Sequence, residues 1–288
     1  MASATLEDLR AIVLRSFPEL AHARFTLLTT GWDSVAVDVD EALIFKFPRH
    51  AAAEKALRAE ASLLSLVRPE VTMAVPHLTL CPGPPLFSRH VKLKGEHLVA
   101  AHYERLPVEA RERLAADLAL FYAELHHLNA ADVEVAGGGP IRPWLKPDDI
   151  LRRIEPILPA ELHPIAEETI AAWQRLPPDP HGTTYGFFDG HGWNMAFDHT
   201  SNRLNGVYDF GDSGFGPLRQ DVIYSSFISP DLTARIIDAY EHLTGLALDP
   251  RSIHLLSGVL RLWELAECAR EPDQMRRNVA HWATFQTL

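Results

Sequence analysis

The hydrophobic pattern of this 288-residue chain changes its period near residue 94. Before that point, short alternating segments separated by turn residues predict an antiparallel sheet. Strand patterns lie at 25–28, 35–39, 43–47 and 86–93, and helical patterns lie at 5–16 and 51–67. After Gly95 the pattern is mainly helical. The sequence therefore predicts an α+β protein with a small sheet lobe at residues 1–94 and a larger helical lobe at residues 95–288.

The second lobe contains one expected interruption of its helices. Helical spacing is clearest over 114–128, and similar patterns lie at 148–158, at 161–175 and from about 231 onward. Between them, the segments 195–198 and 204–208 alternate and are joined by polar residues. This pattern predicts a β-hairpin within the helical lobe.

The composition and net charge of the chain exclude several classes of protein. Hydrophobic residues make up 47% of the chain and charged residues 23%, which is typical of a folded globular protein. The formal net charge of −11 repels nucleic acid and attracts a cationic ligand. The two cysteines lie outside any metal-binding pattern, and neither a signal peptide nor an apolar membrane span is evident. We expect a soluble cytoplasmic protein with no nucleic-acid or membrane partner.

Two short motifs flank the predicted hairpin. Asp189 and Asn194 are five residues apart before it, and the tripeptide Asp209-Phe210-Gly211 follows it. A turn centred between Ser201 and Asn202 predicts that Asn194 pairs opposite Asp209. Carboxylate and amide oxygens in that arrangement suit Mg²⁺.

The two motifs together reproduce elements of kinase catalysis. The D-x-x-x-x-N element supplies a carboxylate that orients the acceptor hydroxyl, and the Asn and the second Asp hold metal ions. The alternative is that Asp189 and Asn194 are ordinary turn residues and that the tripeptide arises by chance. Each motif alone is common, but their order and spacing together favour the functional interpretation.

The first lobe offers a cation for nucleotide phosphates. Lys46 lies in the apolar strand 43–47 and alternates away from Phe45 and Phe47. On the following helix, Glu60 falls within the apolar stripe, where a carboxylate needs a cationic partner. The pattern favours a Lys46–Glu60 ion pair over the alternative of an exposed lysine and an exposed glutamate.

A turn between the first two strands is the expected cover for the phosphates. It has one glycine, Gly31, and Ser34 follows it. Gly31 permits close approach of the backbone, and Ser34 offers a hydroxyl or an amide. The turn matches neither a P-loop nor the glycine-rich loop of protein kinases.

These stretches resemble the aminoglycoside phosphotransferase family, in particular the subgroup that acts on the 2″-hydroxyl of gentamicin-like drugs. The resemblance spans about residues 25–225. The matching stretches are Gly31 to Ala36, Ile44 to Pro48, Glu60 with its context, Asp189 to Asn194, Asp209 to Gly214, and Asp221. The resemblance implies a two-lobed protein-kinase-like fold, ATP or GTP as phosphoryl donor and Mg²⁺ as cofactor, and it leaves open whether the protein confers antibiotic resistance.

The resemblance also implies roles for individual residues. Asp189 would be the catalytic base, Asn194 and Asp209 the metal ligands, and Asp221 a support for the catalytic loop. The nucleotide base would bind the linker backbone near Arg89, His90 and Val91. The chain departs from the family at Phe187-Phe188-Asp189, where His-Gly-Asp is usual. An aromatic residue therefore replaces a hydrogen-bonding brace of the loop.

The acceptor site is less specified. Glu264 and Glu267 are spaced to share one helix face, and such carboxylates could bind a cationic acceptor. The alternative is a solvated face with Arg261 and Arg270 as local ion partners. His191 and Asp212 lie within the two motifs and are further candidates for substrate contact.

Three functions agree with these patterns. The first is a kinase for aminoglycosides, and the second is a kinase for another small alcohol, either a metabolite or an antibiotic. The third is a catalytically weak nucleotide-binding homologue, which the Phe187-Phe188 departure keeps open. The sequence specifies neither the hydroxyl nor the choice between ATP and GTP.

Overall fold

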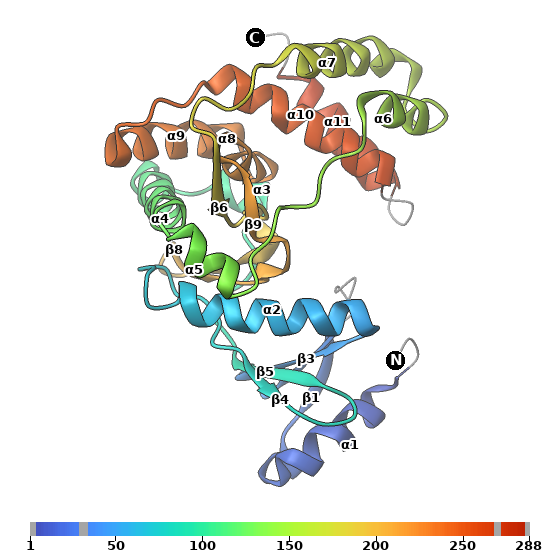
Figure 1. Ribbon diagram of the computed structural model, residues 1–288, viewed down its shortest axis with the longest axis vertical. Coiled ribbons are helices and arrows are strands. Elements are labelled where there is room, and N and C mark those ends of the chain that lie inside the picture. Colours follow the sequence, from blue (N-terminus) through green and yellow to red (C-terminus); the bar gives the residue numbers. More distant parts are fainter. Residues whose placement is uncertain (1–3, 29–33, 268–271, 286–288) are drawn as a thin grey trace. The chain divides into compact units, whose positions relative to one another are not determined.

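The computed structural model describes residues 4–28, 34–267 and 272–285. The chain forms two compact units, which Figure 1 shows coloured along the sequence. Unit 1 comprises residues 1–96, 127–139 and 195–211. Unit 2 comprises residues 97–126, 140–194 and 212–288. Two later segments thus join the N-terminal region in unit 1. Within the described ranges, no helix combines the length and the apolar character needed to cross a membrane.

Unit 1 contains a five-stranded antiparallel sheet in the order β1-β2-β3-β5-β4. The strands are β1 Phe25–Leu28, β2 Ser34–Val39, β3 Leu43–Pro48, β4 Thr79–Cys81 and β5 Phe87–Val91. The predicted antiparallel sheet is confirmed. The sequence did not predict β4, which is short and lies among prolines.

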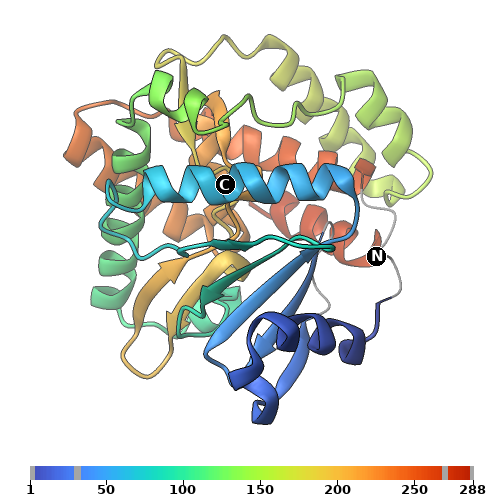
Figure 2. The ribbon, with the colours of Figure 1, turned by 60° about the horizontal axis from the view of Figure 1, so that its bottom comes forward.

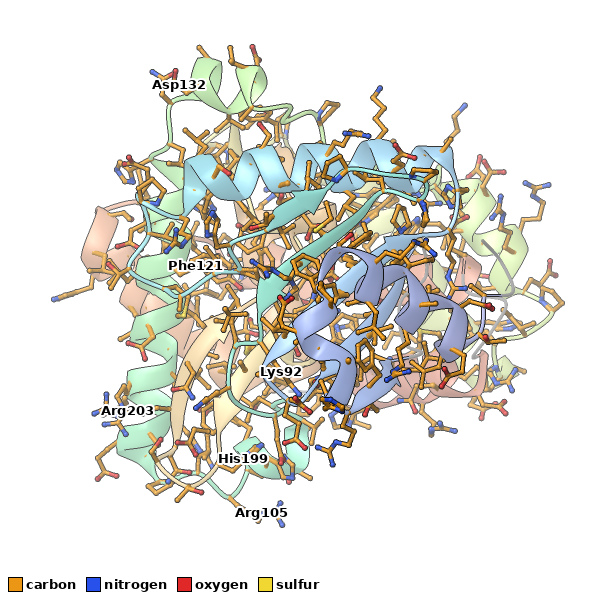
Figure 3. The ribbon with its side chains drawn as sticks, turned by 90° about the horizontal axis from the view of Figure 1, so that it is seen from below. Lys92, Arg105, Phe121, Asp132, His199 and Arg203 are labelled. Carbon is orange, nitrogen blue, oxygen red and sulfur yellow. The ribbon has the colours of Figure 1, made fainter. Side chains whose placement is uncertain are left out.

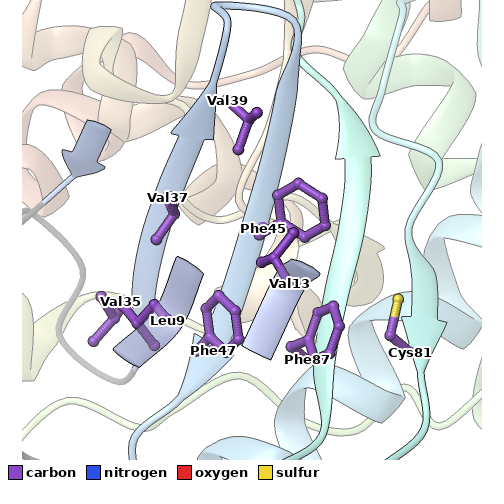
Figure 4. Close-up of a cluster of buried hydrophobic side chains, with 9 residues drawn as sticks. All are labelled: Leu9, Val13, Val35, Val37, Val39, Phe45, Phe47, Cys81 and Phe87. Carbon is purple, nitrogen blue, oxygen red and sulfur yellow. The ribbon is translucent and has the colours of Figure 1, made fainter. Parts of the chain in front are cut away.

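One face of this sheet packs on helix α1, Leu6–Ser16. Figure 4 shows Leu9 and Val13 of α1 among the strand residues of this core. Phe45, Phe47 and Phe87 form the aromatic part of the cluster, with centroids of Phe47 and Phe87 5.1 Å apart. Alternation along β3 therefore sends both of its phenylalanines to this face and Lys46 to the other.

Helix α2, Ala51–Val67, lies across the opposite side of the sheet (Figures 1 and 2). Its buried residues include Leu57, Leu64 and Val67, as its apolar period predicts. Glu60 is buried with them. The helix therefore presents a carboxylate on its buried face. A short helix, α5 Ala130–Val135, also belongs to unit 1.

The predicted hairpin consists of β7 Met195–Asp198 and β8 Arg203–Val207 in unit 1. His199 and Arg203, at its turn end, are labelled in Figure 3. The predicted register is wrong by one residue: Met195 pairs with Val207, whereas pairing of Asn194 with Asp209 would require Tyr208 opposite Met195. At the turn end Asp198 pairs with Arg203, so the turn is centred one residue earlier than predicted. The bulge after Ala196 skips one residue of β8 and partly offsets this difference.

Unit 2 is mainly helical. Its α-helices are α3 Ala100–Tyr103, α4 Val108–His126, α6 Pro147–Ile154, α7 His163–Arg175, α8 Leu218–Asp221, α9 Pro230–Thr244, α10 Pro250–Glu267 and α11 Pro272–Ala283. Helix α4 packs along α9. One core cluster joins α6, α7, α10 and α11 through Ile150, Ile154, Ile170, Leu262 and Val279, among others. The apolar stripes of these helices meet there.

A two-stranded antiparallel pair runs through unit 2. It consists of β6 Thr183–Gly186 and β9 Gly214–Pro217, with Gly186 opposite Gly214. The sequence did not predict this pair. Its strands carry the chain into and out of the segment that contains Asp189 and the hairpin.

Candidate functional site

Lys46 lies between two carboxylates within unit 1. Its ammonium nitrogen is 3.1 Å from Glu60 Oε2 and 2.8 Å from Asp209 Oδ1. The predicted ion pair between Lys46 and Glu60 is confirmed. The alternative of two exposed side chains is wrong, because Glu60 is only 6% exposed.

The backbone after β8 brings Asp209 to this lysine. Asp209 has a φ of +67°, in the left-handed region, and the chain then enters a 3₁₀ helix, η4 Phe210–Asp212. The backbone amide of Phe210 donates to Glu60 Oε1 at 3.2 Å. Glu60 therefore holds both the lysine and the backbone next to Asp209.

The environment keeps Lys46 positively charged. Burial alone would lower its pKa, but the charges of Glu60 and Asp209, and its hydrogen bonds to both, outweigh burial and raise the pKa. An ammonium group has three donors and can bind several oxygens at once. Lys46 is thus a fixed cation suited to phosphate.

Of the residues predicted to contact the nucleotide, Ser34 and His90 are described by the structure, whereas Gly31 lies outside the described residues. Ser34 begins β2 and is buried. His90 lies on β5 opposite Ile44, so it shares the sheet face of Lys46. Burial and the charge of Lys46 lower the pKa of His90 to about 4, so the ring is neutral at physiological pH.

The other two β5 candidates do not point their side chains toward the lysine. Arg89 lies opposite Phe45 in the ladder, and its guanidinium is 4.7 Å from the ring centroid of Phe17, on the aromatic face of the sheet. Val91 is 69% exposed. Of these two residues, only the backbone could form hydrogen bonds with a nucleotide base, and that role stays a prediction.

In unit 2, two residues of the same loop hold Asp189. Asn194 Nδ2 donates to Asp189 Oδ2 at 2.5 Å, and His191 Nε2 lies 3.1 Å from Asp189 Oδ1. The loop closes in a 3₁₀ helix, η3 Gly192–Asn194. The amide nitrogen of Asn194 faces Asp189, so the carbonyl oxygen of the same side chain points away from Asp189. The structure therefore brings Asp189, His191 and Asn194 together.

His191 is tuned by its carboxylate neighbours. Burial alone would lower the pKa of His191, but its hydrogen bond with Asp189 and the charges of Asp189 and Glu264 raise the pKa overall. The ring therefore gains positive charge next to Asp189 more readily than a free histidine would. This places a proton-carrying group beside the predicted base.

Asp221 anchors the chain just before Asp189. It is fully buried, and it accepts hydrogen bonds from the backbone amides of Phe187, at 3.0 Å, and Phe188. His126 Nε2 lies 3.1 Å from Asp221 Oδ2, and the other ring nitrogen of His126 lies 2.8 Å from the Tyr240 hydroxyl. The sequence did not indicate His126 or Tyr240 as supports, because no local spacing links residues so far apart.

Removing the Asp221 carboxylate is expected to destabilise unit 2 strongly. In Asp221→Ala, two buried amides and His126 lose their acceptor. The expected loss is about 3–5 kcal/mol of unfolding free energy, as for other broken buried charge networks. Urea denaturation measures it. Asp148→Asn, at an exposed position of the same unit, is the control and should change the value by less than about 0.5 kcal/mol. A loss below about 1 kcal/mol in Asp221→Ala would contradict the anchoring role.

Comparison with known proteins places the chain in a family. The sequence profile of the phosphotransferase enzyme family matches residues 24–256. The chain belongs to this family. No curated protein matches its sequence.

Solved structures share the phosphotransferase fold. The GDP complex of wild-type aminoglycoside 2′-phosphotransferase-IIIa aligns with a TM-score of 0.79 at 20% identity, over 98% of this chain and 97% of that one. A GDP and kanamycin complex of an APH(2″) enzyme gives 0.75 at 19% identity, over 96% of each chain. A type I macrolide 2′-phosphotransferase gives 0.69 at 15% identity, over 97% and 99%.

These findings confirm the predicted family, the α+β kinase-like fold and the class of enzyme, a small-molecule phosphotransferase. At these identities, the structural likeness establishes the fold. The roles of individual residues remain predictions and depend on the contacts described above.

Glu264 of the phosphotransferase is the predicted acceptor residue with the most perturbed environment. It lies on α10, and its Oε2 atom is buried with no hydrogen-bond partner among the described residues. Burial raises the pKa of Glu264 to about 7, although the charges of Arg261 and His191 oppose the shift. The carboxyl is therefore poised to change charge near neutral pH.

The raised pKa predicts a pH-dependent stability. A carboxyl whose pKa is higher in the folded state binds protons more tightly there, so unfolding free energy falls as pH rises from 4.5 to about 7. Glu264→Gln lacks this dependence, so its stability relative to the natural protein should increase between pH 5 and pH 8. Urea denaturation at both values measures the difference. The exposed Glu168→Gln is the control. An equal difference at both pH values in Glu264→Gln would contradict the raised pKa.

Glu267 does not pair with Arg261, one of the two arginines expected as local ion partners of this helix face. Glu267 Oε1 lies 2.6 Å from Arg153, and Glu267 Oε2 pairs with Arg142. Arg261 is instead buried and donates to Ser226, and Arg270 lies outside the described residues. Two guanidinium groups already offset the charge of Glu267.

Asp212, the remaining substrate candidate, ends the 3₁₀ helix η4 and is exposed. Its neighbour Ser213 accepts a hydrogen bond from the Tyr185 hydroxyl at 3.0 Å. The position of Asp212 at a turn surface agrees with either substrate contact or a solvated loop, and substrate contact stays a prediction.

Proposed function

We propose that this phosphotransferase moves the γ-phosphoryl group of ATP or GTP to a hydroxyl of an amino sugar, with an aminoglycoside as the first acceptor to test. The single observation that supports donor binding most strongly is the Lys46–Glu60–Asp209 cluster. In kinases, a strand lysine paired with a helix glutamate positions nucleotide phosphates, next to a metal-binding aspartate. The same three residue types meet here.

Lys46 is proposed to bind the phosphates of the nucleotide. Glu60 holds the ammonium group from within the apolar face of α2, so the lysine enters the complex already oriented. Little conformational freedom is then lost when phosphate binds. His90 lies on the same sheet face as Lys46, because its partner in the ladder, Ile44, is two residues from Lys46 on β3.

Asp209 and Asn194 are proposed to hold Mg²⁺. Asp209 would contribute a carboxylate whose side chain is 51% exposed, and Asn194 would contribute its amide carbonyl oxygen. Hard cations of this size prefer such oxygen ligands and complete their shell with water and phosphate oxygens. When bound, Mg²⁺ supplies neutralisation of the negative charge on the phosphate oxygens.

Asp189 is proposed to act on the acceptor. The acceptor oxygen forms a bond to the γ-phosphorus, the bond from that phosphorus to the bridging oxygen breaks, and the nucleoside diphosphate leaves. The hydroxyl proton passes to the Asp189 carboxylate. His191 and Asn194 orient this carboxylate, and Asp221 holds the backbone that precedes it.

A cationic acceptor agrees with the charges of the chain. The net charge is −11, and Glu264 couples electrostatically to His191 and Asp189 in unit 2. One related structure contains kanamycin. The macrolide phosphotransferase likeness supports the alternative of another antibiotic or small alcohol. Cytoplasmic location and a contribution to antibiotic resistance belong to the same proposal.

The test is an acceptor screen with the purified full chain. ATP and GTP are each combined with Mg²⁺ and with a polycationic aminoglycoside, a macrolide or a neutral sugar, and phosphorylated product is detected by mass spectrometry. We expect product with the aminoglycoside and its loss when Mg²⁺ is chelated. Product with only the macrolide or the sugar would overturn the acceptor assignment. Absence of product with all three, despite nucleotide binding, would favour the catalytically weak alternative.

A further inference from the structure

Phe188, directly before Asp189, has a backbone conformation that favours glycine. Its φ is +52°, in the left-handed region that side chains with a Cβ rarely adopt. The residue is nevertheless a phenylalanine that is 2% exposed. Something in the surrounding structure must therefore hold it in this disfavoured conformation.

Two glycines give the ring of Phe188 its space. A Cβ built on Gly216 would lie 2.6 Å from Phe188 Cζ, and one built on Gly186 would lie 2.9 Å from Phe188 Cε2. Both distances are too short for real carbon contacts. A Cβ on Gly186 would also meet the Asp221 carboxylate, and one on Gly216 would lie 2.6 Å from Ile141 Cδ1. We call Gly186 of β6 and Gly216 of β9 the Phe188 socket, because a side chain at either position would crowd the ring.

The backbone of Phe188 is tied as well. Its amide donates to the fully buried Asp221, which His126 holds in turn. The preceding Phe187 packs edge-on against Phe121, with ring centroids 5.8 Å apart. Phe188 is thus fixed at its amide and at its ring, one peptide bond from Asp189.

We propose that Phe188 is a positioning residue, which fixes the direction of the Asp189 carboxylate through a ring seated in the Phe188 socket. If the ring left the socket, the disfavoured φ would relax and rotate the peptide that leads to Asp189. The proposal rests on the proposed function, in which Asp189 acts on the acceptor. It explains how a loop with Phe187-Phe188 keeps Asp189 bonded to Asn194 and His191.

The test uses three variants that change the ring or its socket. Phe188→Ala removes the ring but keeps the Cβ that disfavours this φ, so the backbone is free to relax. Phe188→Leu keeps an apolar side chain, and Gly216→Ala crowds the socket from the neighbouring strand. We expect kcat to fall about 100-fold in Phe188→Ala and in Gly216→Ala, because small misplacements of reacting groups have effects of this order. KM for nucleotide should stay within about threefold, because Lys46 is unchanged.

Rescue separates positioning from general damage. The double variant Phe188→Leu with Gly216→Ala should recover part of the kcat lost in Gly216→Ala, because leucine relieves the contact with the ring although the contact with Ile141 remains. Gly139→Ala is the matched control, because a Cβ there meets nothing within 4 Å. It should have the kcat of the natural protein.

Each outcome decides the proposal. It is overturned if Phe188→Ala keeps the natural kcat, or if the loss in Gly216→Ala is fully explained by its unfolded fraction at the assay temperature. If Phe188→Ala does not fold, Gly216→Ala and the double variant decide alone. Inactive Asp189→Asn with fully active Phe188→Ala would refute only the positioning role. Natural activity in Asp189→Asn would refute the proposed function instead.

Discussion

Asp189→Asn is expected to lower kcat about 10³-fold while nucleotide binds with unchanged affinity. Asparagine keeps the shape of the side chain, but its one carbonyl oxygen can accept from only one of Asn194 and His191, and it cannot take up the acceptor proton. A positioned general base typically contributes 10²–10⁴-fold to the rate, hence the estimate of about 10³. Single-turnover transfer measures the rate, and calorimetric titration measures the nucleotide Kd.

Asp148→Asn is the control for this substitution. It makes the same chemical change at an exposed position of unit 2, at the start of α6. Its kcat should equal that of the natural protein. A loss of less than about fivefold in Asp189→Asn would contradict the assignment of Asp189 as base. Parallel losses of rate and nucleotide affinity would instead indicate that Asp189 acts in binding.

Lys46→Met is expected to abolish nucleotide binding and to destabilise unit 1 by about 3–5 kcal/mol. The substitution leaves Glu60 buried without its cation, and unpaired buried charges have penalties of this size. The double variant Lys46→Met with Glu60→Leu removes both charges and fills the space with apolar atoms. It should recover part of the stability, because the Phe210 amide still lacks its acceptor, and none of the nucleotide affinity.

Stability and affinity therefore separate the two roles of Lys46. Urea denaturation and calorimetric titration measure them on the same samples. Glu54→Gln is the control, because Glu54 forms an exposed pair with Arg58 at 2.9 Å and should change stability by less than about 0.5 kcal/mol. Natural nucleotide affinity in the double variant would show that Lys46 supports only the fold.

Local patterns were sufficient to predict β1 to β3, α1 and α2, and the ion pair between β3 and α2. Alternation along β3 placed Lys46 opposite the phenylalanines, and the period of α2 placed Glu60 among its buried residues. Both patterns depend only on neighbours within the same element, and burial of an unpaired carboxylate is too costly to occur. The pairing of Lys46 with Glu60 followed from these two facts.

Features that depend on distant residues could not be predicted in this way. The strands β6 and β9 contain glycines and a proline, so they lack a strand pattern. The turn between β7 and β8 is centred one residue earlier than predicted, and nothing in the sequence marks which residue the bulge skips. The partners of Glu267, Arg142 and Arg153, come from another part of the chain, so spacing along α10 did not indicate them.

The catalytic loop shows the same limit. Asp189, His191 and Asn194 were predicted because they share one short motif, and the structure brings them together. Their support by His126 and the seating of Phe188 depend on packing between separate elements. Sequence alone identified Phe188 as a departure from its family but not how the fold accommodates it.

The most direct test of the central claim is a crystal structure with Mn²⁺ and a non-hydrolysable nucleoside triphosphate, in which anomalous scattering locates the metal. We expect the metal within coordination distance of the Asp209 carboxylate and the Asn194 carbonyl oxygen, with Lys46 on a phosphate oxygen. A triphosphate bound away from Lys46, or a metal that contacts neither Asp209 nor Asn194, would contradict the proposed function.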